Sequence, residues 1–89
     1  MHLVAVTLIC PDPVSSQVTA EAVTDLIWLH CRREDRVEHI RSRADLHRYC
    51  IAAAVIADTP DAAIASLRHV CERAVQHAPA LRGWQLDLT

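Results

Sequence analysis

Residues 48–58, RYCIAAAVIAD, decide the fold. Residues 49–57 of this stretch carry no charge, and the run is too short for a membrane span, which needs about 20 apolar residues. Thr59, Pro60 and Asp61 follow it with the signal of a helix start. A short apolar run that ends in this way is typical of a strand covered on both faces. We therefore predict a central strand of a sheet here.

The composition is that of a folded domain. A chain of 89 residues is long enough for one domain with its own core, so we assign residues 1–89 to a single domain. Apolar residues make up 52% of the chain, which argues against disorder. The formal charge of -2 gives no reason to expect a nucleic-acid partner. All nine basic residues are arginine and alanine occurs 14 times, a bias typical of GC-rich genomes such as those of actinobacteria.

The first apolar run, residues 3–10, is interpreted as a strand and not as a signal peptide. No basic region precedes it, and Pro11, Asp12 and Pro13 end it without the usual cleavage site of small residues. No stretch is long enough to span a membrane, so we expect no membrane association. Four cysteines without a secretion signal favour reduced thiols and a cytoplasmic location.

Three further strands follow from the same patterns. Residues 2–10 form the first, because their β-branched and apolar residues occupy both alternate faces. Residues 36–42 form a weaker strand whose charges suit the edge of a sheet, and residues 43–45 form the turn after it. Residues 84–89 alternate apolar with polar positions, which predicts a half-buried last strand with Trp84 in the core.

Two helices are predicted between these strands. The first runs over residues 17–31, with Ser15 or Ser16 as its N-cap. The second starts at Thr59 and ends before Pro79. Its apolar residues form one stripe, which consists of Ala63, Ile64, Leu67, Val70, Cys71, Ala74, Val75 and Ala78.

Trp28 falls on the polar side of the first predicted helix, near Glu21 and Arg32. Tryptophan is costly to leave in water and is enriched at contact surfaces. We therefore predict that Trp28 is partly exposed in the isolated subunit and marks a surface for a partner.

The element order β-α-β-β-α-β resembles the ferredoxin-like, split β-α-β fold group. In that group strands one and three are central, and here those two strands are apolar on both faces. The resemblance implies an α+β sandwich, with a four-stranded antiparallel sheet and two helices on one face. A weak repeat at an offset of 40 residues, which matches Cys10 to Cys50 and Ala22 to Ala62, agrees with two βαβ halves. ACT-like sensors and dimeric α+β barrel enzymes share this order, but fold does not imply function.

The cysteines give no sign of a metal or redox site. Cys10, Cys31, Cys50 and Cys71 include no C-x-x-C pair, so we predict that all four are reduced and metal-free. Cys50 and Cys71 are interpreted as small buried hydrophobic residues. Cys10 ends the first strand, where metal-trafficking domains of this fold group carry two cysteines and a glycine. The sequence I-C-P-D-P lacks the second cysteine and the glycine.

Phosphate, cofactor and RNA motifs are missing from the sequence. The single glycine, Gly83, cannot supply a phosphate-binding loop or a dinucleotide fingerprint, and ACT-like ligand loops also usually carry a glycine. Exposed aromatics on central strands would be needed to stack RNA bases, and only Tyr49 stands there. We expect no cofactor and no nucleic acid.

The densest polar cluster surrounds the expected turn before the central strand. Its members are His39, Arg41, Arg43, Asp45, His47 and Arg48. Histidine can act there as an acid–base with arginine holding an anion, although an exposed charged hairpin tip gives the same pattern. If the chain is an enzyme of the dimeric α+β barrel type, with a pocket between sheet and helices, its catalytic candidates are Asp12, His39, His47, Arg48 and Tyr49.

The leading hypothesis is a small, non-catalytic, homodimeric binding or accessory domain for a small molecule or another protein. One layer of helices covers only one face of a sheet, yet both alternate sets of the central strands are apolar. The uncovered set would be an exposed patch of a kind that monomers rarely tolerate. We therefore predict a homodimer through the sheet, and we assign its interface to Ile9, Tyr49, Ile51, Ala53 and Val55. An enzyme would instead need a closed pocket with at least two convergent titratable groups.

Overall fold

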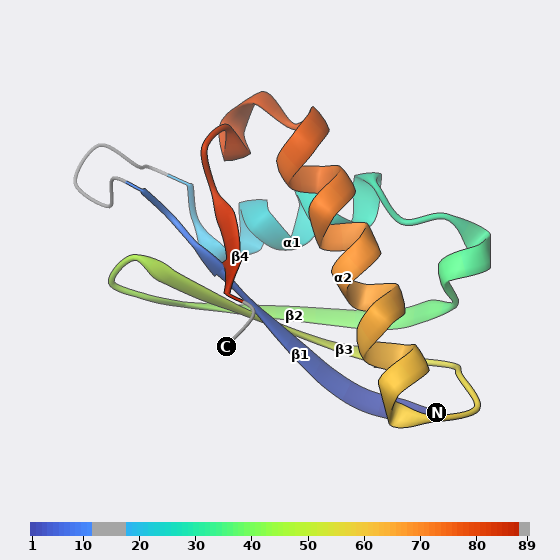
Figure 1. Ribbon diagram of the computed structural model, residues 1–89. Coiled ribbons are helices and arrows are strands. Elements are labelled where there is room, and N and C mark those ends of the chain that lie inside the picture. Colours follow the sequence, from blue (N-terminus) through green and yellow to red (C-terminus); the bar gives the residue numbers. More distant parts are fainter. Residues whose placement is uncertain (12–17, 88–89) are drawn as a thin grey trace.

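The two apolar strands lie side by side in the middle of a four-stranded antiparallel sheet (Figure 1). β1 (His2–Ile9) pairs with β3 (Arg48–Val55) over the full length of both strands. β2 (Val37–Asp45) pairs with the other side of β3, and β4 (Gln85–Asp87) pairs with the other side of β1. The order is β2-β3-β1-β4, which confirms that the first and third strands are central and the other two are edges.

Two helices lie on the same side of this sheet (Figure 1). The computed structural model describes residues 1–11 and 18–87, and it places α1 at Ala20–Leu29 and α2 at Pro60–His77. α1 packs mainly over β2, and α2 packs mainly over β1. The result is an α+β architecture in two layers.

Each helix begins at a threonine whose side chain caps it. The hydroxyl oxygens of Thr19 and Thr59 each accept a hydrogen bond of 3.1 Å from the backbone N–H three residues later. The two caps are 40 residues apart, so the weak repeat corresponds to the helix starts. α1 is shorter than the predicted residues 17–31. The predicted cap residues, Ser15 and Ser16, lie outside the described residues.

The predicted turn between the second and third strands is in the wrong place. β2 includes residues 43–45, and the chain turns at Leu46 and His47. Leu46 has a φ of 54°, in the left-handed region that glycine, asparagine or aspartate usually occupies in such turns. Neither glycine nor asparagine marks this turn, so the sequence pattern offers no signal for its position.

Side chains fill the space between the sheet and the helices. The rings of Tyr49 and Trp84 have centroids 4.7 Å apart, and the Tyr49 hydroxyl donates a hydrogen bond of 2.6 Å to the carbonyl oxygen of Val18. Trp84 is buried, which confirms its predicted place in the core. The largest fully buried side chains are Leu8, Val23, Ile27, Ile51, Val55, Leu67, Val70, Cys71 and Leu81.

The prediction of which sheet face is open is wrong. Tyr49, Ile51, Ala53 and Val55 belong to the core beneath the helices, so they are not free to form an interface. Among the residues of the predicted interface, Ile9 alone lies on the face away from the helices, where it pairs with Arg48. Side-chain size explains the arrangement, because the bulky set of β3 is needed to fill the space under two helices.

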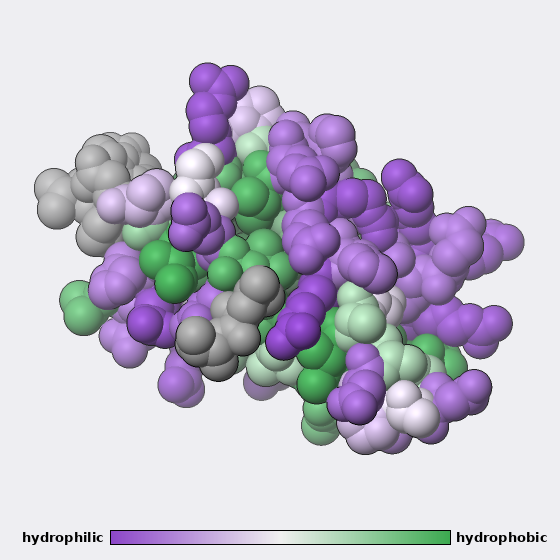
Figure 2. Space-filling view, viewed as in Figure 1, coloured by the Kyte–Doolittle hydropathy of each residue, from purple (hydrophilic) through white to green (hydrophobic). Residues whose placement is uncertain are grey.

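The solvent side of α2 is hydrophilic (Figure 2). The predicted apolar stripe of this helix faces the core, where Ala63, Leu67, Val70, Cys71 and Ala74 are buried. Across residues 1–11 and 18–87, no helix combines the length and the apolar character that crossing a bilayer requires.

Two leucines of β1 provide a matched test of this arrangement. Leu8 is fully buried and Leu3 is 86% exposed, on opposite faces of the same strand. We expect Leu8→Ala to lower the free energy of unfolding by about 2–5 kcal/mol, because it leaves a cavity in the core. In protein too dilute to associate, Leu3→Ala should change it by less than about 0.5 kcal/mol. Urea denaturation of both variants measures the difference, and equal losses would mean that the two faces are assigned incorrectly.

Candidate functional site

The uncovered face of the sheet is the candidate site. Its centre is formed by β1 and β3, whose side chains on this face are mostly apolar, and its sides by charged and polar side chains of the two edge strands. By register, the face comprises Leu3, Ala5, Thr7 and Ile9 of β1, His39, Arg41, Arg43 and Asp45 of β2, Arg48, Cys50, Ala52 and Ala54 of β3, and Gln85 and Asp87 of β4. Such alternation follows from the two-residue period of a strand.

A hollow of about 330 Å³ lies on this face. It is lined by Leu3 of β1, by His39 and Arg41 of β2, and by residues 52–54 of β3. Leu3, Ala54 and His39 stand in one row across the three strands. Ala54 is only 6% exposed although it stands on the side of the sheet away from the helices, so its longer neighbours stand over it. The hollow therefore has a floor of alanine between two taller walls.

Of the arginines on this face, one forms an ion pair and two form none with the described residues. Arg48 forms an ion pair with Asp87, with Nη1 and Oδ2 2.8 Å apart across β1. Among the described residues, the guanidinium groups of Arg41 and Arg43 form no ion pair or hydrogen bond. These two groups are therefore available to an anion or to acidic side chains of another molecule.

The four catalytic candidates that the structure describes do not converge. Tyr49 lies in the core and its hydroxyl is bonded to Val18, whereas Arg48 is on the opposite face. His39 is six residues before the end of β2, which is about 20 Å from the turn that holds His47. The prediction that His39 flanks this turn is therefore wrong. Asp12 lies outside the described residues.

The cysteines differ in exposure from the sequence prediction. Cys71 is fully buried, as predicted, and Cys10 is also buried. Cys50, predicted to be buried, is exposed on the uncovered face. Burial raises the pKa of Cys71 to about 12. The pKa of Cys31 rises to about 11, through burial and then through the nearby carboxylate of Asp35.

A second, larger hollow of about 530 Å³ lies beside α2 and the short 3₁₀ helix η1 (Arg33–Asp35). At its wall, Arg73 donates hydrogen bonds of 2.9 and 2.8 Å from Nη2 to the two carboxylate oxygens of Asp35. Asp35 also accepts a bond of 2.7 Å from the backbone N–H of Arg32, and Ser66 donates one of 2.6 Å to its carbonyl oxygen. These groups satisfy one another, so the cluster joins the α1–β2 connection to α2 and leaves neither charge free for a ligand.

The sequence did not reveal this ion pair. Asp35 belongs to a charged connection and Arg73 to the polar side of α2, so each looks like an ordinary solvated residue. Their side chains are only 13% and 18% exposed, respectively. No local pattern in the sequence joins these two residues, which are 38 positions apart.

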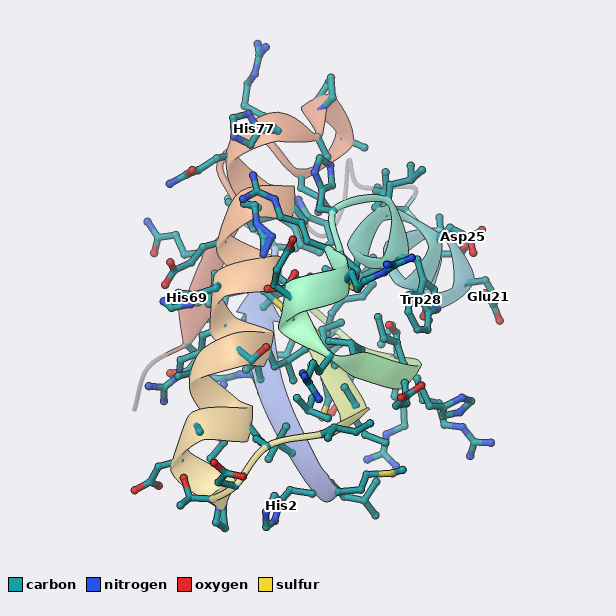
Figure 3. The ribbon with its side chains drawn as sticks, turned by 90° about the vertical axis from the view of Figure 1, so that its right-hand side faces the viewer. His2, Glu21, Asp25, Trp28, His69 and His77 are labelled. Carbon is teal, nitrogen blue, oxygen red and sulfur yellow. The ribbon has the colours of Figure 1, made fainter. Side chains whose placement is uncertain are left out.

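Trp28 is 40% exposed, which confirms its predicted exposure. It projects from the same side of α1 as Glu21 and Asp25, and the next residue, Leu29, is 76% exposed (Figure 3). This surface is separate from the uncovered face, because α1 lies on the other side of the sheet.

The histidines are spread over the molecule (Figure 3). His2, His69 and His77 lie at different levels of the fold, and His77 stacks on His30 with ring centroids 6.2 Å apart. In the part of the chain that the structure describes, no group of three or more histidine, cysteine, aspartate or glutamate side chains is arranged to hold a metal ion.

The thiols should differ strongly in their rate of alkylation. At pH 8, a thiol with a pKa of about 12 has only about one ten-thousandth of its molecules as the reactive thiolate. In dilute protein, iodoacetamide should therefore modify Cys50 first and Cys71 last. Peptide mapping by mass spectrometry gives the order, with urea-denatured protein as the control in which the four rates converge. Equal rates for Cys50 and Cys71 in the folded protein would contradict the assigned faces.

Known proteins offer no further guide to this site. Comparisons with protein-family models, with curated proteins and with solved structures found no match to the chain. The function has to be inferred from the geometry of the uncovered face.

Proposed function

We propose that this protein is a small, non-catalytic binding domain that acts as a homodimer, with the uncovered sheet faces of two copies packed together. We assign it to the ferredoxin-like, split β-α-β fold group. The strand order β2-β3-β1-β4 supports this assignment, because it places strands one and three in the centre and joins each central strand to an edge strand through one helix.

The observation that carries the proposal is the apolar centre of the uncovered face. Leu3 is 86% exposed, and the neighbouring Ala5 and Ala52 are also exposed. Burying an exposed leucine side chain stabilises a complex by about 1.5–3 kcal/mol. The alanines add little area themselves, but they let a second backbone approach closely.

The charges on the face suit a second copy of the same chain. A twofold interface brings the same surface of both partners together, so it is favoured where that surface carries both signs. Arg41 and Arg43 of β2 stand on the same face as Asp45 of that strand. In a twofold pair, the arginines of one copy can meet the aspartate of the other.

The size of the face is adequate for such a dimer. Eight residue pairs of β1 and β3 extend over about 27 Å, the three longer strands extend over about 14 Å, and the three residues of β4 add a strip about 10 Å long. The projected area is roughly 440 Å², and the relief of the side chains raises the accessible area toward the roughly 800 Å² per partner of a standard complex.

An enzyme of the dimeric α+β barrel type is the alternative that the strand order allows. Two observations favour the binding domain over it. Fully buried side chains such as Leu8, Ile51 and Leu67 occupy the space between sheet and helices where such an enzyme keeps its pocket. Among the described residues, the catalytic candidates also lie on two faces and at opposite ends of β2.

The exposed surface around Trp28 supports a second contact, made with another protein. Tryptophan supplies a large contact area with few rotatable bonds, and here it is flanked by the carboxylates of Glu21 and Asp25 (Figure 3). This contact would leave the sheet free for the second copy, because α1 lies on the opposite side of the sheet.

One matched pair of variants tests the dimer. Light scattering should give twice the chain mass of 9.9 kDa at micromolar concentration. Ala52→Glu, which puts a carboxylate at the centre of the uncovered face, should halve that mass without changing the circular dichroism spectrum. Ala65→Glu, on the exposed side of α2, and Trp28→Glu should leave the mass unchanged.

Two outcomes would contradict this proposal. The first is a wild-type protein that is monomeric at micromolar concentration. The second is a dimer that Trp28→Glu dissociates and Ala52→Glu does not, which would place the interface on α1. Ile51→Glu serves as the control for unfolding, because Ile51 is fully buried in the core.

A further inference from the structure

The hollow on the uncovered face has the chemistry of a ligand site. Pockets for small molecules are mostly apolar, with volumes of about 300–1,000 Å³ and a few placed polar groups. This hollow is at the lower end of that range, and its walls are mostly apolar. Its polar side chains, His39 and Arg41, both come from β2, so they stand on one side of it.

Arg41 sets the charge of the ligand. Its guanidinium has no ion pair or hydrogen bond among the described residues. A planar guanidinium with free N–H groups matches a carboxylate, which can accept two parallel hydrogen bonds from it. His39 lies two residues away on the same face of β2 and can donate a further hydrogen bond.

The opposite side sets the shape of the ligand. Leu3 forms an apolar wall on β1, and the methyl groups of Ala52 and Ala54 form the floor. A fully hydrated inorganic anion gains nothing from these surfaces, whereas an apolar group that covers them leaves water.

We propose that the hollow binds a small organic carboxylate with an apolar body. The carboxylate bonds to Arg41 and His39, and the body lies over Ala52 and Ala54 against Leu3. This inference rests on the proposed dimer, because a second sheet would close the open side of the hollow and exclude water from the guanidinium–carboxylate pair.

Benzoate and benzamide are matched probes for this site, since they share an apolar ring and differ in charge. In NMR titrations of the isotope-labelled full chain, benzoate should shift the amide signals of Ala52, Ala54 and Arg41. Benzamide and inorganic phosphate should bind at least about tenfold more weakly, the loss expected when hydrogen bonds to a charged group or an apolar contact are removed.

Two variants and one control test which residues form the site. Arg41→Gln should weaken benzoate binding about tenfold or more and leave benzamide binding unchanged. Ala54→Leu should abolish benzoate binding by filling the floor, and Arg68→Gln, on the exposed side of α2, should have no effect. Equal affinities for benzoate and benzamide, or benzoate shifts that persist in Arg41→Gln, would overturn the inference. So would phosphate binding as tightly as benzoate.

The same samples separate this inference from the proposed dimer, because light scattering reports the mass with and without benzoate. A dimer that does not bind benzoate in the hollow refutes the ligand site and leaves the dimer standing. A monomer that binds benzoate with the expected pattern refutes the dimer and leaves the site standing.

Discussion

Two central strands with apolar side chains on both sides, and helices on only one side, set the constraint on which the rest of this structure depends. A strand in the middle of a sheet forms backbone hydrogen bonds along both edges, and its successive side chains point to opposite faces. The two faces therefore differ only in their side chains. The helices cover the face with the bulkier residues of β3, Tyr49, Ile51 and Val55. The smaller residues, Cys50 and Ala52, remain on the other face.

The properties of the uncovered face follow from this division of large and small side chains between the two faces. The small side chains of β3 project only a short distance from the sheet, whereas the longer side chains of the neighbouring edge strand, such as Arg41 and His39, project further. The face is therefore flat enough for another sheet, yet it is indented where alanines lie between longer neighbours. An apolar centre with charged sides is typical of association surfaces.

Polar contacts hold the helical layer in place around the core. The pair between Arg73 and Asp35 joins α2 to the connection that follows α1, and the Thr24 hydroxyl donates a bond of 2.6 Å to the hydroxyl of Ser42 on β2. These contacts lie on the helix side of the sheet. On the uncovered face, Arg48 is paired with Asp87, but Arg41 and Arg43 form no ion pair among the described residues. Those two side chains can therefore rearrange around a partner.

The sequence predicts the architecture well where local signals are strong. Thr59 and Pro60 locate the start of α2, and the apolar character of β1 and β3 identifies the centre of the sheet. Prediction fails where two alternatives have the same local pattern. Both faces of β3 are apolar, so periodicity cannot say which one the helices cover. For that reason the sequence predicts a buried Cys50 and an interface position for Ile51, whereas Cys50 is exposed and Ile51 is buried. The sizes of the side chains and the hydroxyl of Tyr49, which needs a buried partner, are the signals that would have chosen correctly.

The candidate site could be predicted only in part. The residues of the uncovered face come from four strands, and the pairing of His39 with Ala54 depends on a register that the misplaced turn would have shifted. A wrong turn position moves every residue of β2 relative to β3. The charged residues of β2 were therefore recognised as a cluster, but their place beside an alanine floor was not.

The most direct test of the sheet-to-sheet dimer is an isotope-filtered NMR experiment on a mixture of labelled and unlabelled protein. It detects only those nuclear Overhauser effects that pass between two copies of the chain. We expect effects to the methyl groups of Leu3 and Ala52 and none to those of Val23 or Leu67, which lie in the core. Effects confined to α1, or none at a concentration where the protein is dimeric, would contradict it.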